Sequence, residues 1–250
     1  MRAEDIPMYR LYGELAWLWP VMSAPAEYAE EAAHWRSLLR ETLGPGRQPI
    51  LELGVGGGHN LSHFASEFVP VAVDLSEPML AHSRRLNPAV EHHLGDMRSI
   101  RLGRRFRAVL IHDAVSHMLD ENDLLAALRT AAAHLEPGGL LLAAPDRFED
   151  GFVSPEVDRG QGCADGLSLT YFEYTHLIRE GVPRVETILT YVIDQGGTVQ
   201  VELDRMHTGL FPLATWRRLF GQAGFSFVAR RLPLSSIAGD YVILQGILQR

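Results

Sequence analysis

The residue pattern most suggestive of chemistry is a glycine-rich turn with an acidic residue on either side. Glu52-Leu-Gly54-Val-Gly56-Gly-Gly58 follows an apolar run, and Asp74 comes twenty positions after Gly54. Glycines permit a tight turn and let the backbone approach a bound ligand closely. A carboxylate at Asp74, at the end of the next apolar run, can accept hydrogen bonds from both ribose hydroxyls of a nucleoside. The pattern therefore predicts a site for a nucleoside-containing cofactor.

Glu52 indicates which nucleoside cofactor the turn accepts. A dinucleotide such as NAD would place its pyrophosphate over the same turn, where the carboxylate of Glu52 would repel it. The ammonium group of a methionine-like tail would instead be attracted. A nicotinamide oxidoreductase also requires Gly-x-Gly-x-x-Gly, and the third glycine here, Gly58, falls one position early. These residues favour S-adenosylmethionine (SAM) and leave a nicotinamide oxidoreductase as the weaker alternative.

Alternating strands and helices are expected to hold these residues in place. Short apolar runs predict strands, and apolar positions at helical spacing predict helices. The predicted strands are 49–53, 69–73, 106–111, 140–144, 225–231 and 241–248, and the predicted helices are 26–43, 60–67, 77–86, 121–135 and 213–222. Alternation of this kind is typical of βαβ units and a parallel sheet, so the predicted fold class is α/β.

The region between the fourth and fifth of these strands differs in composition and in predicted secondary structure. Residues 145–166 are rich in Asp, Gly and Pro, and no strand is predicted there. Three β-rich stretches follow at 168–178, 184–194 and 198–207, and Gly181-Val-Pro183 and Gln195-Gly196-Gly197 separate them like hairpin turns. We predict a single domain, 1–250, with an N-terminal helical cap (about 1–45) and an antiparallel β insertion (about 146–208). The insertion either covers an acceptor pocket or pairs across a homodimer.

The motifs resemble those of the class I SAM-dependent methyltransferases. After Asp74-Leu75-Ser76-Glu-Pro-Met79-Leu80, and beyond a further strand, Gly95-Asp96-Met97 stands at the spacing typical of that family. The resemblance implies a Rossmann-like sheet with helices on both faces, and SAM as the cofactor. It also implies where the cofactor is held. By this resemblance the methionine end meets Glu52, Gly54, Gly56 and Gly58. The ribose meets Asp74 beside Leu75, and the adenine meets Met79, Asp96 and Met97. His112 and Asp113 form the floor beneath the sulfonium.

Several segments resemble one group of this family, the TDP-aminosugar N,N-dimethyltransferases. They are Gly95-Asp96-Met97-Arg98, Arg101-Leu-Gly103-Arg-Arg-Phe106, His134-Leu-Glu-Pro-Gly-Gly139 and Leu210-Phe211, and the similarity is good over 28–145 and looser beyond. The resemblance implies an amine site lined by an N-terminal tyrosine, Tyr9 or Tyr12, and by His117. A histidine titrating near pH 7 suits the orientation and deprotonation of an amine. The segment Leu15-Ala-Trp17-Leu-Trp19-Pro20 departs from the group by being more apolar and aromatic.

Composition restricts the partners and the compartment. A net charge of -8 and a pI near 5.7 argue against a long nucleic acid as substrate. Cys163 is the only cysteine, and no His-Glu-x-x-His motif occurs, so we expect neither a disulfide nor a bound metal. The N-terminus lacks a signal-peptide pattern, and no apolar stretch is long enough to span a bilayer. We therefore expect a cytoplasmic protein that does not enter a membrane.

The sequence indicates the identity of the methyl donor more clearly than that of the acceptor molecule. The expected function is methyl transfer from SAM to a small-molecule acceptor, with the amine of a nucleotide-linked aminosugar as one candidate. A small-molecule O-methyltransferase and a non-catalytic SAM-binding protein remain as alternatives, because an intact donor site does not prove a productive acceptor site.

Overall fold

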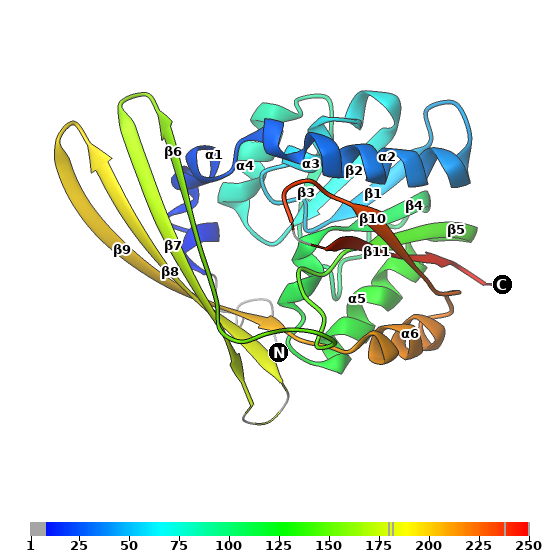
Figure 1. The fold of residues 1–250 in the computed structure, drawn as a ribbon. Helices are drawn as coiled ribbons and strands as arrows, with labels where there is room; N and C mark the ends of the chain where they lie inside the picture. Colours follow the sequence, from blue (N-terminus) through cyan, green and yellow to red (C-terminus); the bar gives the residue numbers. More distant parts are fainter. Residues whose placement is uncertain (1–8, 180, 182, 238, 250) are drawn as a thin grey trace.

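A seven-stranded sheet forms the body of the protein in a computed structural model that describes residues 9–179, 181, 183–237 and 239–249 (Figure 1). Its strand order is β10-β11-β5-β4-β1-β2-β3. β1 to β5 are parallel, whereas β10 and β11 are antiparallel to their neighbours. The bounds are β1 Pro49–Leu53, β2 Val69–Asp74, β3 Glu91–Leu94, β4 Phe106–Ile111, β5 Leu135–Ala143, β10 Val228–Pro233 and β11 Asp240–Ile247. The predicted α/β class is confirmed.

Helices cover both faces of this sheet. One face carries α2 (Ala29–Leu43), α3 (His59–Ser62) and α4 (Glu77–Leu86), and the other carries α5 (Glu121–Ala133) and α6 (Leu213–Gln222). Along β1 the buried side chains alternate, so that Ile50 packs on the α2 side and Leu51 and Leu53 pack on the α5 side. Both faces are therefore apolar, as a parallel sheet covered on both sides requires.

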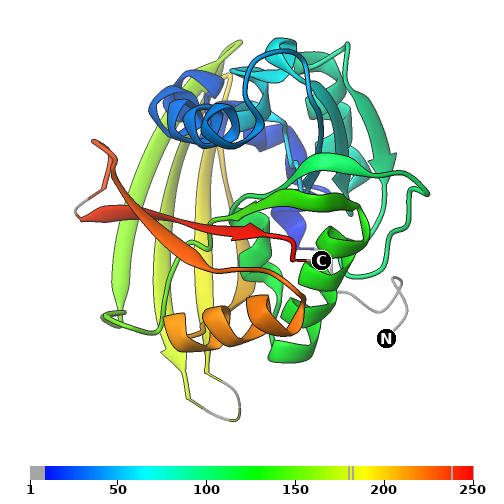
Figure 2. The same ribbon diagram turned by 90° about the vertical axis from the view of Figure 1, so that its right-hand side faces the viewer.

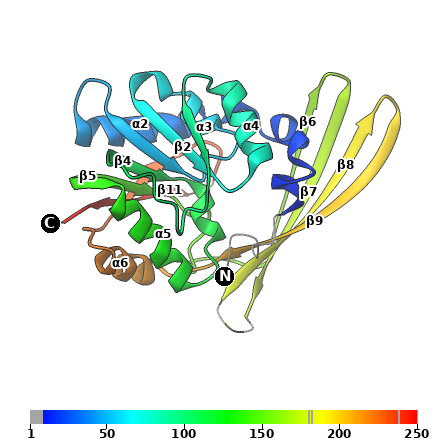
Figure 3. The same ribbon diagram turned by 180° about the vertical axis from the view of Figure 1, so that it is seen from behind.

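A second, four-stranded sheet stands beside the body, with the N-terminal segment between the two (Figures 1 and 3). It is antiparallel throughout, in the order β6-β7-β8-β9. Its strands are β6 Glu156–Ala164, β7 Leu167–Ile178, β8 Arg184–Gln195 and β9 Thr198–Gly209. The segment between the sheets consists of η2 Arg10–Tyr12, η3 Ala16–Leu18, α1 Trp19–Met22 and η4 Pro25–Tyr28.

The N-terminal segment and the second sheet share a core of their own. Leu11, Leu15 and Leu18 are buried against side chains of the inner face of the sheet, namely Leu167, Leu169, Leu189, Tyr191 and Ile193. In Figure 2 the four strands stand behind the main sheet as a separate layer. Residues 1–8 of the predicted cap and Val182 of the predicted turn lie outside the described residues.

Two stretches differ in kind from the sequence prediction, and two strands differ at their ends, because β5 already begins at Leu135 and β10 runs from Val228 to Pro233. β6 lies within 145–166, where no strand was predicted, because most of its residues are exposed and its inward positions include Gly160 and Gly162, which give no apolar alternation. The helix predicted at 60–67 is broken into α3 and a short 3₁₀ turn, η5 (Ala65–Glu67). The chain leaves the helix at His63, and Phe64 is then fully buried against Phe68, with their ring centroids 6.2 Å apart.

None of the helices in the described ranges combines the length and apolarity needed to cross a bilayer. Nor do the described side chains of His, Cys, Asp and Glu form a group of three placed to hold a metal ion.

Candidate functional site

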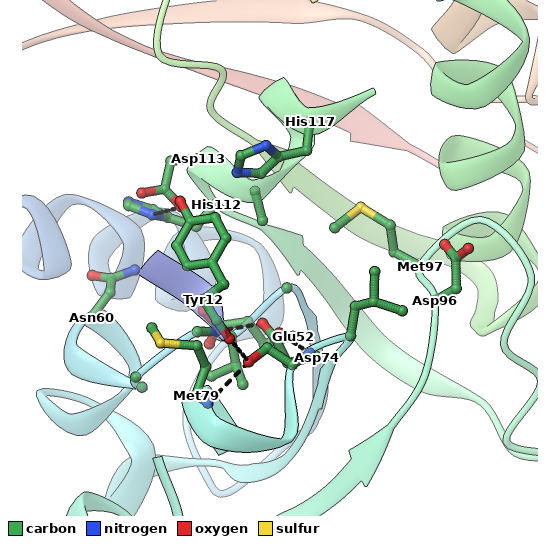
Figure 4. Close-up of a pocket in the computed structure, with 18 of the residues that line it drawn as sticks. Tyr12, Glu52, Asn60, Asp74, Met79, Asp96, Met97, His112, Asp113 and His117 are labelled. Carbon is green, nitrogen blue, oxygen red and sulfur yellow. Dashed lines mark hydrogen bonds and ion pairs between the residues drawn. The ribbon is translucent and has the colours of Figure 1, made fainter. Parts of the chain in front are cut away.

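A cavity opens where the parallel strands β1, β2 and β4 end, and the N-terminal segment forms one of its walls. In open parallel sheets this edge is where ligands bind. The lining brings together all the residues predicted for the site, namely Tyr9, Tyr12, Glu52, Gly54, Gly56, Gly58, Asp74, Leu75, Met79, Asp96, Met97, His112 and His117. Figure 4 shows ten labelled side chains of this lining.

The glycine turn after β1 needs glycine for two different reasons. Gly54 has φ +80°, and a Cβ there would lie 2.3 Å from the Cβ of Ala114, so the close packing of the turn against the β4 end excludes a side chain. Gly56 has φ +55°, and a Cβ there would meet only Met79, at 3.7 Å. The backbone at Gly56 therefore faces the open cavity and is accessible to a ligand.

Asp74 is held in a fixed orientation at the end of β2. Its Oδ2 accepts the N–H of Gly56 at 2.7 Å, and its Oδ1 accepts the N–H of Ser76 at 2.8 Å. Burial raises the pKa of Asp74, while these backbone donors oppose the rise. Asp74 does not cap α4, since the hydroxyl of Ser76 accepts the N–H of Met79. The remaining lone pairs of a preoriented carboxylate are thus free to accept ribose hydroxyls.

The opposite end of the turn carries buried polar atoms that have no partner among the described residues. They are Oε2 of Glu52, both amide atoms of Asn60 and the indole N–H of Trp19. Buried polar groups are normally hydrogen-bonded, so these atoms point to a ligand. A carboxylate suits an ammonium group, and amide and indole N–H donors suit a carboxylate, which are the two charged groups of a methionine tail. The residues present therefore fit the methionine end of SAM.

Sequence reasoning found Glu52 but missed Asn60 and Trp19. Asn60 follows the glycine turn at the start of α3, a position that could have been examined as part of the same motif. Trp19 comes from the N-terminal segment and reaches Gly57, where a Cβ would lie 2.5 Å from the indole nitrogen. No local pattern places Trp19 there, because that contact depends on how the N-terminal segment folds back over the cavity.

His112 lies in the cavity floor but is engaged by protein on both ring nitrogens. Nδ1 lies 3.1 Å from a carboxylate oxygen of Asp113, and Nε2 contacts Glu31. Burial alone would lower the pKa of His112, but the two carboxylates raise it well above its ordinary value. His112 is thus an imidazolium at neutral pH. Asp113, whose side chain is 50% exposed, presents its charge to the cavity instead.

Tyr9, Tyr12 and His117 meet at the outer part of the cavity. The ring centroid of His117 lies 5.5 Å from that of Tyr9 and 5.4 Å from that of Tyr12. The hydroxyl of Tyr9 donates to the carbonyl of His207 at 2.9 Å and accepts its N–H at 3.1 Å. The hydroxyl of Tyr12 has no partner in the described ranges, and Figure 4 shows it directed toward Asp113.

His117 is neutral at pH 7, because burial lowers its pKa although Asp113 opposes the change. Its Nδ1 is buried without a hydrogen-bond partner in the described chain. A neutral imidazole next to a free tyrosine hydroxyl can orient a polar acceptor group by hydrogen bonds.

Asp96 and Met97, from the loop after β3, also line the cavity (Figure 4). The guanidinium of Arg98 bridges Asp96 at 2.8 Å and Asp123 at 2.9 Å, with Arg98 largely buried. This bridge fixes the loop after β3. Met79 is fully buried from α4, so the two methionines offer apolar surface to a flat ring.

Comparison with known proteins places these features in a family. Residues 50–139 match a family model described as a methyltransferase domain. The chain is 37% identical to the dTDP-3-amino-3,4,6-trideoxy-alpha-D-glucopyranose N,N-dimethyltransferase of Streptomyces venezuelae, over 79% of this chain and 83% of that one. It is 35% identical to the dTDP-3-amino-3,6-dideoxy-alpha-D-glucopyranose N,N-dimethyltransferase of Streptomyces fradiae, over 86% and 84%.

The same similarity holds in three dimensions. The crystal structure of Streptomyces venezuelae DesVI superposes with a TM-score of 0.77 at 29% sequence identity, covering 88% of this chain and 92% of that one.

Proposed function

The chain belongs to the class I SAM-dependent methyltransferases, in the group of the TDP-aminosugar N,N-dimethyltransferases, and on that basis we propose that it methylates the amine of a nucleotide-linked aminosugar. SAM is its cofactor. SAM supplies an electrophilic methyl group, so that the acceptor nitrogen forms a new N–C bond with its lone pair while the S–C bond breaks and its electron pair stays on sulfur.

The observation that carries the amine proposal is the charge on the acceptor side of the cavity. Asp113 exposes its carboxylate there, next to the free hydroxyl of Tyr12 and the neutral ring of His117. A negative site attracts an amine in its ammonium form and stabilises the alkylammonium product. An alcohol acceptor gains neither benefit, which is why we favour N-methylation over the small-molecule O-methyltransferase alternative.

Each part of the cavity receives a role in this proposal. Glu52 and Asn60 bind the methionine end of SAM, and Asp74 binds the ribose. The adenine lies among Met79, Asp96 and Met97. Tyr12 and His117 orient the acceptor nitrogen, and Tyr9 supports their wall through its hydrogen bonds to His207. His112 acts indirectly, as the fixed partner that keeps Asp113 ionised.

One experiment tests donor and acceptor together. Purified enzyme is incubated with SAM and dTDP-3-amino-3,4,6-trideoxyglucose, and products are followed by mass spectrometry. We expect mono- and dimethylated sugar from wild-type enzyme and none from Asp74→Ala, which should also lose binding of S-adenosylhomocysteine in isothermal titration. NADH serves as the negative control for binding. Methylation of the 3-hydroxy analogue but not of the amine would contradict the proposal.

We also propose that the outer face of the second sheet pairs with a second copy of the chain. This face carries five apolar side chains that are 43 to 73% exposed, namely Val157, Phe172, Tyr174, Val201 and Leu203. Monomeric proteins rarely expose such a contiguous patch. A two-fold axis through the patch would set the apolar side chains of one copy against those of the other.

A further inference from the structure

The backbone of Tyr12 is held on one side by the start of α4. There the hydroxyl of Ser76 donates to the carbonyl oxygen of Tyr12 at 2.5 Å and accepts the backbone N–H of Met79 at 3.1 Å. The backbone N–H of Ser76 donates to Oδ1 of Asp74 at 2.8 Å. Ser76 is only 2% exposed, and it belongs to the lining of the cavity. One buried serine thus connects Asp74 with the chain at Tyr12.

The second sheet holds the same stretch of chain from the other side. Oδ2 of Asp204, on β9, accepts the backbone N–H of Leu11 at 2.8 Å, and its Oδ1 accepts the N–H of Arg205 at 2.8 Å. Both Asp204 and Leu11 are buried, so water competes little for this hydrogen bond. Two adjacent residues, Leu11 and Tyr12, are therefore attached to one layer through a backbone donor and to the other through a backbone acceptor.

The side chain of Tyr12 extends from these attachments to the acceptor side of the cavity. Its ring centroid lies 5.4 Å from that of His117 and 6.2 Å from that of Trp19, with the rings edge to face in both pairs. Its hydroxyl is directed toward Asp113 (Figure 4). Methyl transfer requires the acceptor nitrogen in line with the S–C bond, and a misplacement of about 1 Å can cost about 100-fold in rate. The position of the Tyr12 hydroxyl relative to the cofactor therefore matters for the reaction.

We propose that Ser76 and Asp204 are positioning residues of the methyl transfer, which clamp the backbone at Tyr12 between the two sheets and so fix its hydroxyl relative to the cofactor. The inference rests on the proposed function, because it requires that Tyr12 orients the acceptor amine. Ser76 acts through its side chain alone, since its contact with Asp74 is made by the backbone and survives a change of side chain. The same hydroxyl also caps α4, so the test must separate capping from positioning.

The first arm of the test changes Ser76. For Ser76→Ala we expect kcat with dTDP-3-amino-3,4,6-trideoxyglucose to fall about fivefold, because a displaced orienting group loses most of its effect. Binding of S-adenosylhomocysteine in isothermal titration should be unchanged. Ser76→Thr keeps a hydroxyl and should restore most of the rate. Asp120→Ala is the matched control, since Asp120 caps α5 by accepting the N–H groups of Asn122 and Asp123. It should lower the melting temperature as Ser76→Ala does and keep the wild-type kcat.

The second arm is a double-mutant cycle that shows whether both residues act through Tyr12. Asp204→Ala should lower kcat as Ser76→Ala does. In a Tyr12→Phe background each of these changes should alter kcat by less than about twofold, because the hydroxyl that they position is absent. Asp194→Ala, which removes a carboxylate that accepts the N–H of Gly197 in the same sheet, is the control for Asp204→Ala and should keep its kcat. Asp204→Asn takes the place of the alanine variant if that variant does not fold.

Three results would overturn the inference. The first is a kcat for Ser76→Ala no lower than that of Asp120→Ala, which would assign the hydroxyl to capping alone. The second is weaker binding of S-adenosylhomocysteine by Ser76→Ala, which would make Ser76 a cofactor residue. The third is a pair of losses that multiply when either change is combined with Tyr12→Phe, since independent sites are additive in free energy. If wild-type enzyme methylates no aminosugar, the proposed function itself fails and this inference fails with it, an outcome visible before any variant is assayed.

Discussion

The two tyrosines at the acceptor side differ in what their hydroxyls bind, and this separates their roles. Tyr9 makes two hydrogen bonds to the backbone of His207, whereas the Tyr12 hydroxyl faces the cavity. We expect Tyr12→Phe to lower kcat about tenfold with an unchanged melting temperature. Tyr9→Phe should keep its kcat and lose about 1–2 kcal/mol of unfolding free energy. Assays at saturating SAM and thermal denaturation of both variants would show the opposite pattern if the roles were exchanged.

Glu52 makes cofactor binding depend on pH. Burial raises its pKa to about 8, so the carboxyl is mostly protonated at pH 7 before SAM binds. An ammonium partner favours the carboxylate, so binding must release a proton and must weaken as pH falls below about 8. Titration of S-adenosylhomocysteine at pH 7 should give different heats in phosphate and Tris buffers. Glu52→Gln should bind more weakly and with equal heats in both. Equal heats for the wild type would contradict the prediction.

Residues of the site that belong to local motifs were predicted from their spacing, whereas Tyr9, Tyr12 and His117 were named only through the family resemblance and Trp19 was not assigned to the cofactor. Gly54, Gly56 and Asp74 share the β1–α3–β2 unit, so their spacing along the sequence places them together. Trp19 comes from the N-terminal segment, which reaches the cavity only through packing. The choice between Tyr9 and Tyr12 likewise required the contacts of their hydroxyls.

The N-terminal segment is positioned by its contact with β6. The carbonyl oxygen of Val21 would lie 1.9 Å from a Cβ at Gly162, so only glycine lets the segment pack this closely. Gly162→Ala should push α1 away, cost about 1–3 kcal/mol of unfolding free energy and weaken SAM binding through Trp19. Gly221→Ala in α6, where a Cβ meets nothing within 4 Å, is the matched control and should be neutral or stabilising. Unchanged affinity in Gly162→Ala would remove Trp19 from the cofactor site.

Elements with a regular burial pattern were predicted well, and those without one were not. α4 and β4 have the bounds expected from their apolar spacing. The helix α4 buries the residues along one of its sides, and the strand β4 is buried on both of its faces. β6 is largely exposed, and its nine residues all pair with β7. Such a strand is determined by its neighbour and leaves no signal in its own sequence.

The two sheets serve the site from different sides. The parallel sheet supplies the glycine turn, Asp74 and the acidic floor, while the inner face of the second sheet holds the segment that carries Tyr9, Tyr12 and Trp19. Residues 9–28 thus lie between the two sheets and close the cavity from the side of the second sheet (Figure 1). Within this arrangement the inner face is committed to the site, and only the outer face remains available to a partner.

Pairing through that outer face predicts the mass of the protein in solution. Light scattering during gel filtration should give twice the chain mass of 27.8 kDa for the wild type. Val201 and Leu203 are 58% and 57% exposed on β9, so Val201→Glu with Leu203→Glu should give the monomer mass, because two copies would bury four unpaired carboxylates. Val228→Glu on β10, at a valine of the other sheet that is 49% exposed, should leave the dimer intact. A monomeric wild-type protein would refute the pairing.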